Sequence, residues 1–215
     1  MKHSLRFEIQ PQPDDTSCGP TCLAAVYGYW DDPVELPRLI AEIGQLSGGG
    51  TLAVQLACHA LQRGYEATIT TYNLQIFDPT WFTDRHSGDP QFLLEKLQAQ
   101  YELKRGRPRA DDQRLQVATE FYQQFLRLGG RLQMQDLDET LIVRSLSRGL
   151  PLLCGLSATY LYQEPRERVA RGEGGELQGV PDDVGGDPVG HFVVLHGYDP
   201  ASGRVAVADP MHLNP

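Results

Sequence analysis

The chain has 215 residues, of which 40% are hydrophobic and 8% aromatic, and its formal net charge at pH 7 is −9. This length and composition predict one globular domain over residues 1–215. The acidic balance argues against nucleic acid as a partner, because binding to phosphates needs a basic surface. No apolar run approaches the roughly 20 residues of a membrane helix, and residues 1–10 lack a signal-peptide core. We therefore expect a cytoplasmic protein without membrane insertion, and the sequence predicts no particular oligomeric state.

The first motif is a polar loop that runs into a helix at residues 12–23, with a cysteine at the junction. Thr16 and Ser17 suit helix capping, and the apolar run 22–29 continues the helix. Cys18 therefore lies at a helix N-terminus, where unpaired backbone N–H groups and the helix dipole favour the thiolate. Because the thiolate is the nucleophilic form, Cys18 is a candidate nucleophile that needs a base elsewhere in the chain.

Further helices and strands follow in the order of the chain. Helical spacing, with proline or a polar residue near the start and glycine near the end, predicts helices over residues 34–46, 52–63, 88–103, 110–128 and 138–148. Thr51 is expected to cap the second of these, and His59 to lie at its surface or rim. β-type composition predicts strands over residues 65–72, 131–135 and 150–161.

Two patterns in the middle of the chain allow a functional and a structural interpretation. Trp81 and Phe82 could line a binding groove, but packing under a loop is favoured because large aromatic side chains mostly serve cores. The basic run 104–109 could bind nucleic acid. Within an acidic chain, a solvated turn between two helices is the favoured interpretation of that run.

Four cysteines do not predict a disulfide scaffold, and a reducing compartment would keep them as thiols. Cys22, Cys58 and Cys154 fall in apolar segments, and we expect them to be buried packing residues. A zinc site would need ligand pairs at a suitable spacing, which Cys18, Cys22 and the pair Cys58–His59 do not supply. The sequence therefore predicts neither a metal nor another cofactor.

Residues 163–190 are rich in glycine and charge and are too long for a simple connection. They lead directly into His191. Two interpretations stay open, a flap over a cleft and a disordered surface loop.

Two apolar runs flank the turn sequence Asp-Pro-Ala-Ser-Gly at residues 199–203, which predicts a β-hairpin. If Tyr198 pairs with Arg204, the register places Asp209 opposite Val193. Asp209 then lies in the second strand at the end far from the turn.

Because side chains alternate along a strand, His191 shares a face with Val193 and becomes a diagonal neighbour of Asp209. His196 falls on the opposite face and is the poorer partner. Cys18, His191 and Asp209 thus come from separate parts of the chain, as a cysteine–histidine–aspartate triad requires.

These motifs occur in a recognisable order. Gln12 stands six positions before Cys18-Gly19-Pro20-Thr21-Cys22-Leu23, and His191-Phe192-Val193-Val194 and Ala208-Asp209-Pro210 follow near the other end. The set resembles the papain-like bacterial cysteine peptidases that process double-glycine leader peptides of bacteriocins, over residues 10–30 and 189–210. The resemblance implies Cys18 as nucleophile, His191 as general base and acid, Asp209 as the orienting carboxylate and Gln12 as an oxyanion donor.

Early helices and late strands fit a two-lobed α+β arrangement, with Cys18 on a helical lobe and the hairpin on an antiparallel sheet lobe. The resemblance implies that this arrangement is the papain-like fold. We expect a thiol peptidase or amide hydrolase that acts on a peptide or protein substrate through an acyl-enzyme. The bond cleaved stays open between a leader peptide, an isopeptide and another amide. The alternative is a non-catalytic domain of the same fold that binds peptides.

Overall fold

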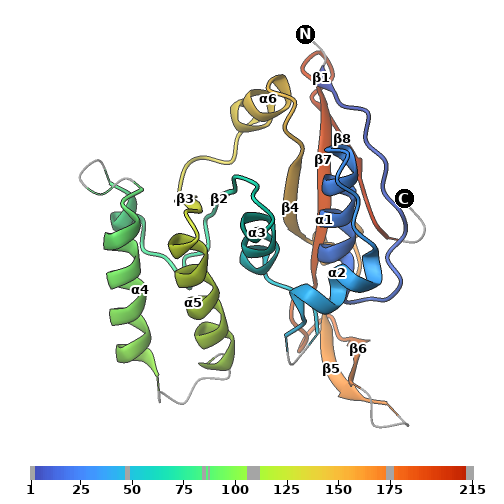
Figure 1. Ribbon diagram of the computed structural model, residues 1–215. Helices are drawn as coiled ribbons and strands as arrows, with labels where there is room; N and C mark the ends of the chain where they lie inside the picture. Colours follow the sequence, from blue (N-terminus) through green and yellow to red (C-terminus); the bar gives the residue numbers. More distant parts are fainter. Residues whose placement is uncertain are drawn as a thin grey trace. The chain divides into compact units, whose positions relative to one another are not determined.

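The computed structural model describes residues 3–46, 49–83, 86, 88–105, 112–172 and 177–211 (Figure 1). This part of the chain is a mixed α+β protein, as the sequence predicts. The sequence predicts one domain over residues 1–215, and within it the contacts of the chain form two compact units. The first unit contains residues 1–51 and 138–215, and the second contains residues 52–137.

The first unit holds helices and antiparallel strands from both ends of the chain. Its helices are α1 (Cys18–Tyr29), α2 (Leu36–Ile43), α6 (Glu139–Ser147) and α7 (Ala158–Leu161). Its strands are β1 (His3–Ser4), β4 (Leu152–Ser157), β5 (Glu167–Arg171), β6 (Leu177–Pro181), β7 (Gly190–Asp199) and β8 (Arg204–Ala208).

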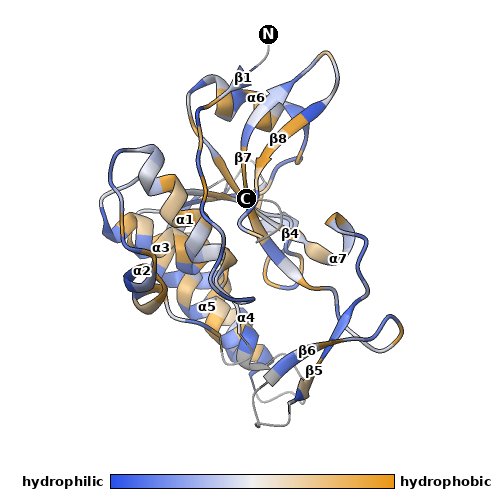
Figure 2. Ribbon diagram, turned by 90° about the vertical axis from the view of Figure 1, so that its right-hand side faces the viewer, coloured by the Kyte–Doolittle hydropathy of each residue, from blue (hydrophilic) through white to orange (hydrophobic). Residues whose placement is uncertain are grey.

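Strand β7 is the centre of a sheet in which it pairs antiparallel with β4, β1 and β8. Helix α1 packs on this sheet, where Cys22 is buried with Val194 and Ala208. β8 is hydrophobic beyond its first residue (Figure 2). The Cys22 thiol donates to the carbonyl of Phe192 at 3.2 Å. The helix of Cys18 and the hairpin, which the sequence places on separate lobes, therefore lie in one compact unit.

The predicted hairpin is present as β7 and β8, but its register at the turn differs from the prediction. Asp199 pairs with Arg204, whereas we expected Tyr198 opposite that arginine. The Asp199 carboxylate accepts from the backbone N–H of Ala201 at 3.0 Å, and Gly203 has a φ of 67°. Asp199 is thus both the last residue of the ladder and the first of the turn.

A β-bulge corrects the register toward the other end of the hairpin. The pairing shifts by one residue between Leu195 and Gly197. Beyond the shift Val194 pairs with Ala208, and Asp209 is the residue that follows β8. The aspartate therefore reaches the position opposite Val193 that the sequence predicts, although the predicted pair at the turn is wrong.

The segment 163–190 contains an antiparallel ribbon that the sequence does not predict. Its strands β5 and β6 pair from Glu167 opposite Pro181 to Arg171 opposite Leu177. At the base of the ribbon, a Cβ on Gly186 would come within 2.7 Å of the Glu167 backbone, so this close approach requires glycine. Disorder is the wrong interpretation for the described part of this segment.

The β-like run 150–161 is a shorter strand than predicted. β4 ends at Ser157, whose hydroxyl accepts from the backbone N–H of Tyr160 at 3.3 Å and caps α7. Residues 158–161 are therefore helical, because the local serine cap overrides their β-type composition.

The second unit contains α3 (Ala53–Gln62), β2 (Thr68–Thr70), the 3₁₀ helix η1 (Pro79–Phe82), α4 (Pro90–Lys104), α5 (Asp112–Arg127) and β3 (Arg131–Gln133). β2 and β3 pair in parallel. Trp81 and Phe82 pack on the buried ring of Phe77, with ring centroids 6.4 and 5.9 Å away. The packing interpretation of these two aromatic residues is confirmed.

All five helices predicted after the first are present, and the ends seen in the described residues differ by no more than three residues from the prediction. Thr51 is not the cap of α3. Leu52 occupies that position, and its backbone N–H donates to Oε1 of Gln55 at 2.7 Å. His59 is only 8% exposed, so its predicted position at the surface or rim of the helix is wrong. Of the basic run, residues 106–109 lie outside the described residues. A search of the described helices finds none with the length and apolarity needed to cross a bilayer.

Candidate functional site

Asp209, directly after β8, accepts three hydrogen bonds. Its Oδ1 accepts from Nε2 of His191 at 2.9 Å and from the backbone N–H of Met211 at 2.9 Å. Its Oδ2 accepts from the hydroxyl of Tyr162 at 2.5 Å. Asp209 is 7% exposed and His191 is 5% exposed. The site is therefore a buried carboxylate with both oxygens occupied.

His191, near the start of β7, lies between this carboxylate and a thiol. Because Nε2 faces Asp209, the neutral ring carries its proton on Nε2 and leaves Nδ1 as the nitrogen available to the side chain of Cys18, which interacts with the ring. Burial lowers the pKa of His191, but its hydrogen bonds to Cys18 and Asp209 outweigh burial and raise the pKa above 6.5. The structure thus brings three predicted site residues together and favours the imidazolium.

The same contacts decide the charge of Asp209. Burial raises the pKa of its carboxyl group, but hydrogen bonds from Tyr162, His191 and the Met211 backbone outweigh burial and lower the pKa below 3.8. Asp209 is therefore ionised at neutral pH and complements the charge of the imidazolium.

Cys18 is the first residue of α1, and a folded loop precedes it. The Asp14 carboxylate accepts from the backbone N–H of Thr16 at 2.8 Å and from its hydroxyl at 2.7 Å. Ser17 occupies the N-cap position, but its hydroxyl donates to the Asp14 carbonyl at 3.1 Å instead of capping the helix. The loop that places Cys18 is therefore held by Asp14, and the predicted side-chain cap is wrong.

Gln12 lies beside the residue that follows Asp209. Its backbone N–H donates to the carbonyl of Pro210 at 2.7 Å, and its Nε2 donates to the carbonyl of Asp14 at 2.9 Å. Its Oε1 is buried without a hydrogen-bond partner. Gln12 thus bridges the loop before Cys18 and the segment after β8, and one hydrogen of its amide nitrogen remains for a further acceptor.

His196, the other histidine of the hairpin, interacts with the N-terminal segment. Its Nδ1 lies 3.2 Å from the carbonyl oxygen of Leu5, and its ring stacks on Phe7 with centroids 5.8 Å apart. These contacts give His196 a structural role in holding the N-terminal segment on the sheet.

The other three cysteines are less suited to nucleophilic chemistry. Cys22 and Cys58 are buried, as predicted, whereas Cys154 is only half-buried. Burial raises the pKa of Cys22 well above 9.0 and the pKa of Cys58 and Cys154 to about 11. No group of three or more histidine, cysteine or acidic residues in the described ranges could hold a metal ion.

We predict that iodoacetamide at pH 6 labels Cys18 in preference to the other cysteines, because Cys18 alone contacts the His191 imidazolium. Cys154 is the matched comparison: it is the more exposed of the two, but its pKa of about 11 leaves it protonated. Peptide mass spectrometry measures the labelling, with urea-unfolded protein at pH 8.5 as the control. Equal labelling of Cys18 and Cys154 in the folded protein contradicts the assignment.

Tyr162 is the site residue that sequence reasoning missed. It follows α7 and contacts Asp209, which is 47 residues further along the chain. Neither periodicity nor spacing connects the two positions. The only signal in the sequence is a polar ring at the end of the apolar run 150–161.

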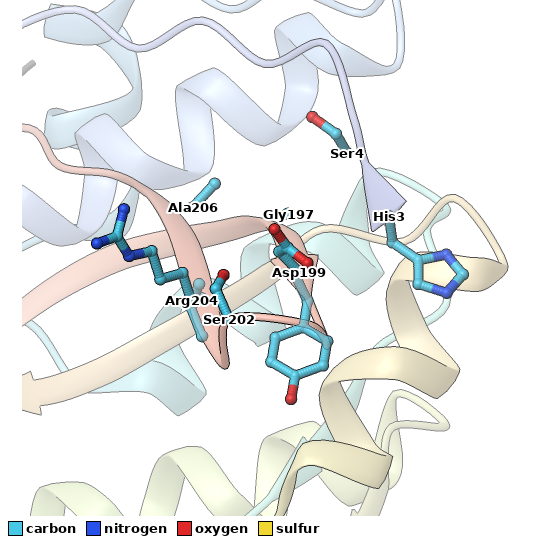
Figure 3. Close-up of a pocket in the computed structure, with 9 residues that line it drawn as sticks. His3, Ser4, Gly197, Asp199, Ser202, Arg204 and Ala206 are labelled. Carbon is cyan, nitrogen blue, oxygen red and sulfur yellow. The ribbon is translucent and has the colours of Figure 1, made fainter. Parts of the chain in front are cut away.

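A pocket lies at the turn end of the hairpin, in the same unit as the site (Figure 3). It has a volume of about 340 Å³, and its polar lining comes from His3, Ser4, Asp199, Ser202 and Arg204. None of the residues around Asp209 lines it, so this pocket is not a substrate pocket for Cys18.

No family model matches the chain, and no curated protein or solved structure is significantly similar to it. The geometry around Cys18, His191 and Asp209 is therefore the basis on which a function can be proposed.

Proposed function

We propose that the chain is a thiol peptidase or amide hydrolase with a papain-like fold and a Cys18–His191–Asp209 triad. The observation that supports it most is a buried histidine whose Nε2 bonds a carboxylate and whose pKa is raised by the side chain of a cysteine at a helix start. This is the arrangement of nucleophile, base and orienting group that acyl transfer needs. Its substrate is a peptide or protein, and a reducing compartment such as the cytoplasm keeps Cys18 a free thiol.

In the first half of the reaction, the Cys18 thiolate attacks the carbonyl carbon of the scissile amide. The oxyanion accepts hydrogen bonds from the backbone N–H of Cys18 and from the amide of Gln12. His191 transfers its proton to the leaving nitrogen, the C–N bond breaks, and a thioester remains on Cys18.

In the second half, water attacks the thioester. His191, now neutral, takes a proton from the water, the C–S bond breaks, and the carboxyl product leaves. The thiolate and the imidazolium are restored. Asp209 stays ionised throughout and stabilises the charged form of His191, which fits its lowered pKa.

The bond that is cleaved stays open between a leader peptide, an isopeptide and another amide. The experiment that tests the proposal is digestion of a proteome-derived peptide library, with new termini identified by mass spectrometry. We expect new termini with the wild type and with the control Cys154→Ser, and none with Cys18→Ser, because a serine hydroxyl is not ionised by His191.

A different result separates the enzyme from a peptide-binding domain. If the wild type retains library peptides on a column but produces no new termini, the hydrolase proposal is wrong and the domain is a binding module. If Cys18→Ser cleaves as well as the wild type, the nucleophile is another residue.

A further inference from the structure

We propose that Tyr162 is a positioning residue of the candidate site, which holds Asp209 so that this carboxylate orients His191. The hydrogen bonds that support this inference are present whatever reaction the protein catalyses, but the expected effect of Tyr162 on turnover rests on the proposed function. The test below therefore includes a measurement that needs no substrate.

The hydrogen bonds to Asp209 are divided over its two carboxylate oxygens. His191 and the Met211 backbone both donate to Oδ1 of Asp209, whereas Tyr162 is the donor to Oδ2. The Asp209 side chain is only 10% exposed. Without the tyrosine hydroxyl, Oδ2 is a buried acceptor that loses its partner, and one end of the carboxylate is no longer fixed.

One short helix, α7, fixes both Tyr162 and the segment that leads into His191. The backbone N–H of Tyr162 donates to the Ala158 carbonyl at 2.9 Å, which places the tyrosine at the end of α7. The other end of α7 is tied to Val189: the Ala158 N–H donates to the Val189 carbonyl at 2.8 Å, and the Val189 N–H donates to the Thr159 hydroxyl at 3.1 Å. Val189 is two residues before His191, so α7 sets the distance between the tyrosine and the histidine.

The phenol of Tyr162 stays protonated, and so stays a hydrogen-bond donor, at any working pH. Burial, the hydrogen bond to Asp209 and the negative charges of Asp209, Glu164 and the Cys18 thiolate all raise the pKa of Tyr162. Its ring centroid lies 5.8 Å from that of His191, with an angle of 58° between the rings. Tyr162 therefore also covers one side of the imidazole and limits its rotation.

Several charged and titratable groups lie around Asp209 and affect its pKa or are affected by its charge. His191 and Tyr162 bond it directly, Cys18 interacts with His191, and the negative charge of Asp209 helps to raise the pKa of the nearby Cys22 thiol. Burial favours the protonated carboxyl group, and among the hydrogen bonds that oppose burial the one from Tyr162 is the largest. Removal of the hydroxyl should therefore move the titration of Asp209 to higher pH.

The test is Tyr162→Phe, with the carboxyl carbon of Asp209 followed by ¹³C NMR as the pH is lowered. We expect the Asp209 midpoint to rise by about one pH unit. The rate of Cys18 alkylation by iodoacetamide should fall about tenfold, and so should kcat on a cleaved peptide, with KM unchanged. The matched control is Tyr198→Phe, which also loses a hydroxyl that donates to a carboxylate, Oε2 of Glu139 at 2.5 Å.

A purely structural role predicts a different outcome. Tyr162→Phe would then lower the Tm but leave the Asp209 midpoint and the alkylation rate at their wild-type values, and the proposal is wrong. If the variant does not fold, Tyr162→3-fluorotyrosine keeps the ring and strengthens the donor, and the Asp209 midpoint should fall; an unchanged midpoint overturns the proposal. If the midpoint shifts as expected but no peptide is cleaved, the positioning role stands and only the hydrolase proposal fails.

Discussion

Replacement of His191 by alanine is expected to lower turnover at least a thousandfold, because the thiolate loses its counter-ion and the leaving nitrogen loses its proton donor. General acid–base catalysis by a positioned side chain contributes on the order of 10²- to 10⁴-fold. The matched control is His196→Ala, in the same strand, whose ring contacts only the N-terminal segment among the described contacts. We expect that control to keep its turnover within about threefold, measured on a peptide that the wild type cleaves.

The opposite ranking of the two variants would show that the wrong histidine is assigned. A Tm for each variant excludes unfolding as the cause of lost activity. Equal losses in both variants at equal Tm would mean that neither histidine is the base.

The His191→Ala variant also has an expected dependence of its stability on pH. A raised pKa means that folded His191 holds its proton more tightly than the unfolded chain does. Its contribution is fully present below pH 6.5 and is lost as the pH rises through the raised pKa. Asp209 has a lowered pKa, so its contribution is present above pH 3.8 and is lost as the pH falls through the folded value. The Tm difference between wild type and His191→Ala should therefore be largest between these limits.

Local patterns in the sequence predict the parts of the site that lie at element boundaries. Cys18 is found at the start of a helix because a polar loop and an apolar run meet there, and both are visible in the sequence. His191 and Asp209 are found because they lie at the ends of two apolar runs of a hairpin. Period and turn composition are enough for these features, since they are set by neighbours along the chain.

The pairing of His191 with Asp209 is reached in spite of a wrong register at the turn. The sequence offers one sign of the bulge between Leu195 and Gly197, which is the glycine inside an apolar strand, but a register counted from the turn leaves it out. The error at Asp199 and the bulge offset each other, so the prediction is right at one end of the hairpin and wrong at the other. A register argument from a turn is therefore weakest beyond the first few pairs.

Contacts between segments that are distant along the chain are the features of the fold and the site that the sequence does not predict. Tyr162 meets Asp209 only because α7 and β8 fold onto the same site. The ribbon of β5 and β6 is not predicted because its glycines and charged residues are typical of a loop. Its base depends on the close approach of Gly186 to the Glu167 backbone, which joins residues that are not neighbours in the sequence. Neither the contact of Tyr162 with Asp209 nor the ribbon has a hydrophobic period, a helix cap or a residue spacing from which it could be predicted.

Gln12→Ala is expected to lower turnover about a hundredfold with little change in peptide affinity. An oxyanion donor acts mainly in the transition state, and removal of one such donor costs about a hundredfold or more in turnover. In the free protein, Nε2 of Gln12 bonds the Asp14 carbonyl, and Oε1 is buried without a partner. The amide is therefore held in place by the loop while one of its two N–H groups stays available.

The control for this last variant is Gln45→Ala, because Gln45 also bonds the loop before Cys18, through Thr16 at 2.9 Å, but from a different segment. If Gln12 only braces the loop, both variants should change turnover and Tm by similar small amounts. If Gln12 is the donor, its loss should lower kcat with KM within about twofold, and Gln45→Ala should behave as the wild type. A Gln12→Ala protein that cleaves at the wild-type rate would leave the backbone N–H of Cys18 as the oxyanion donor and remove Gln12 from the mechanism.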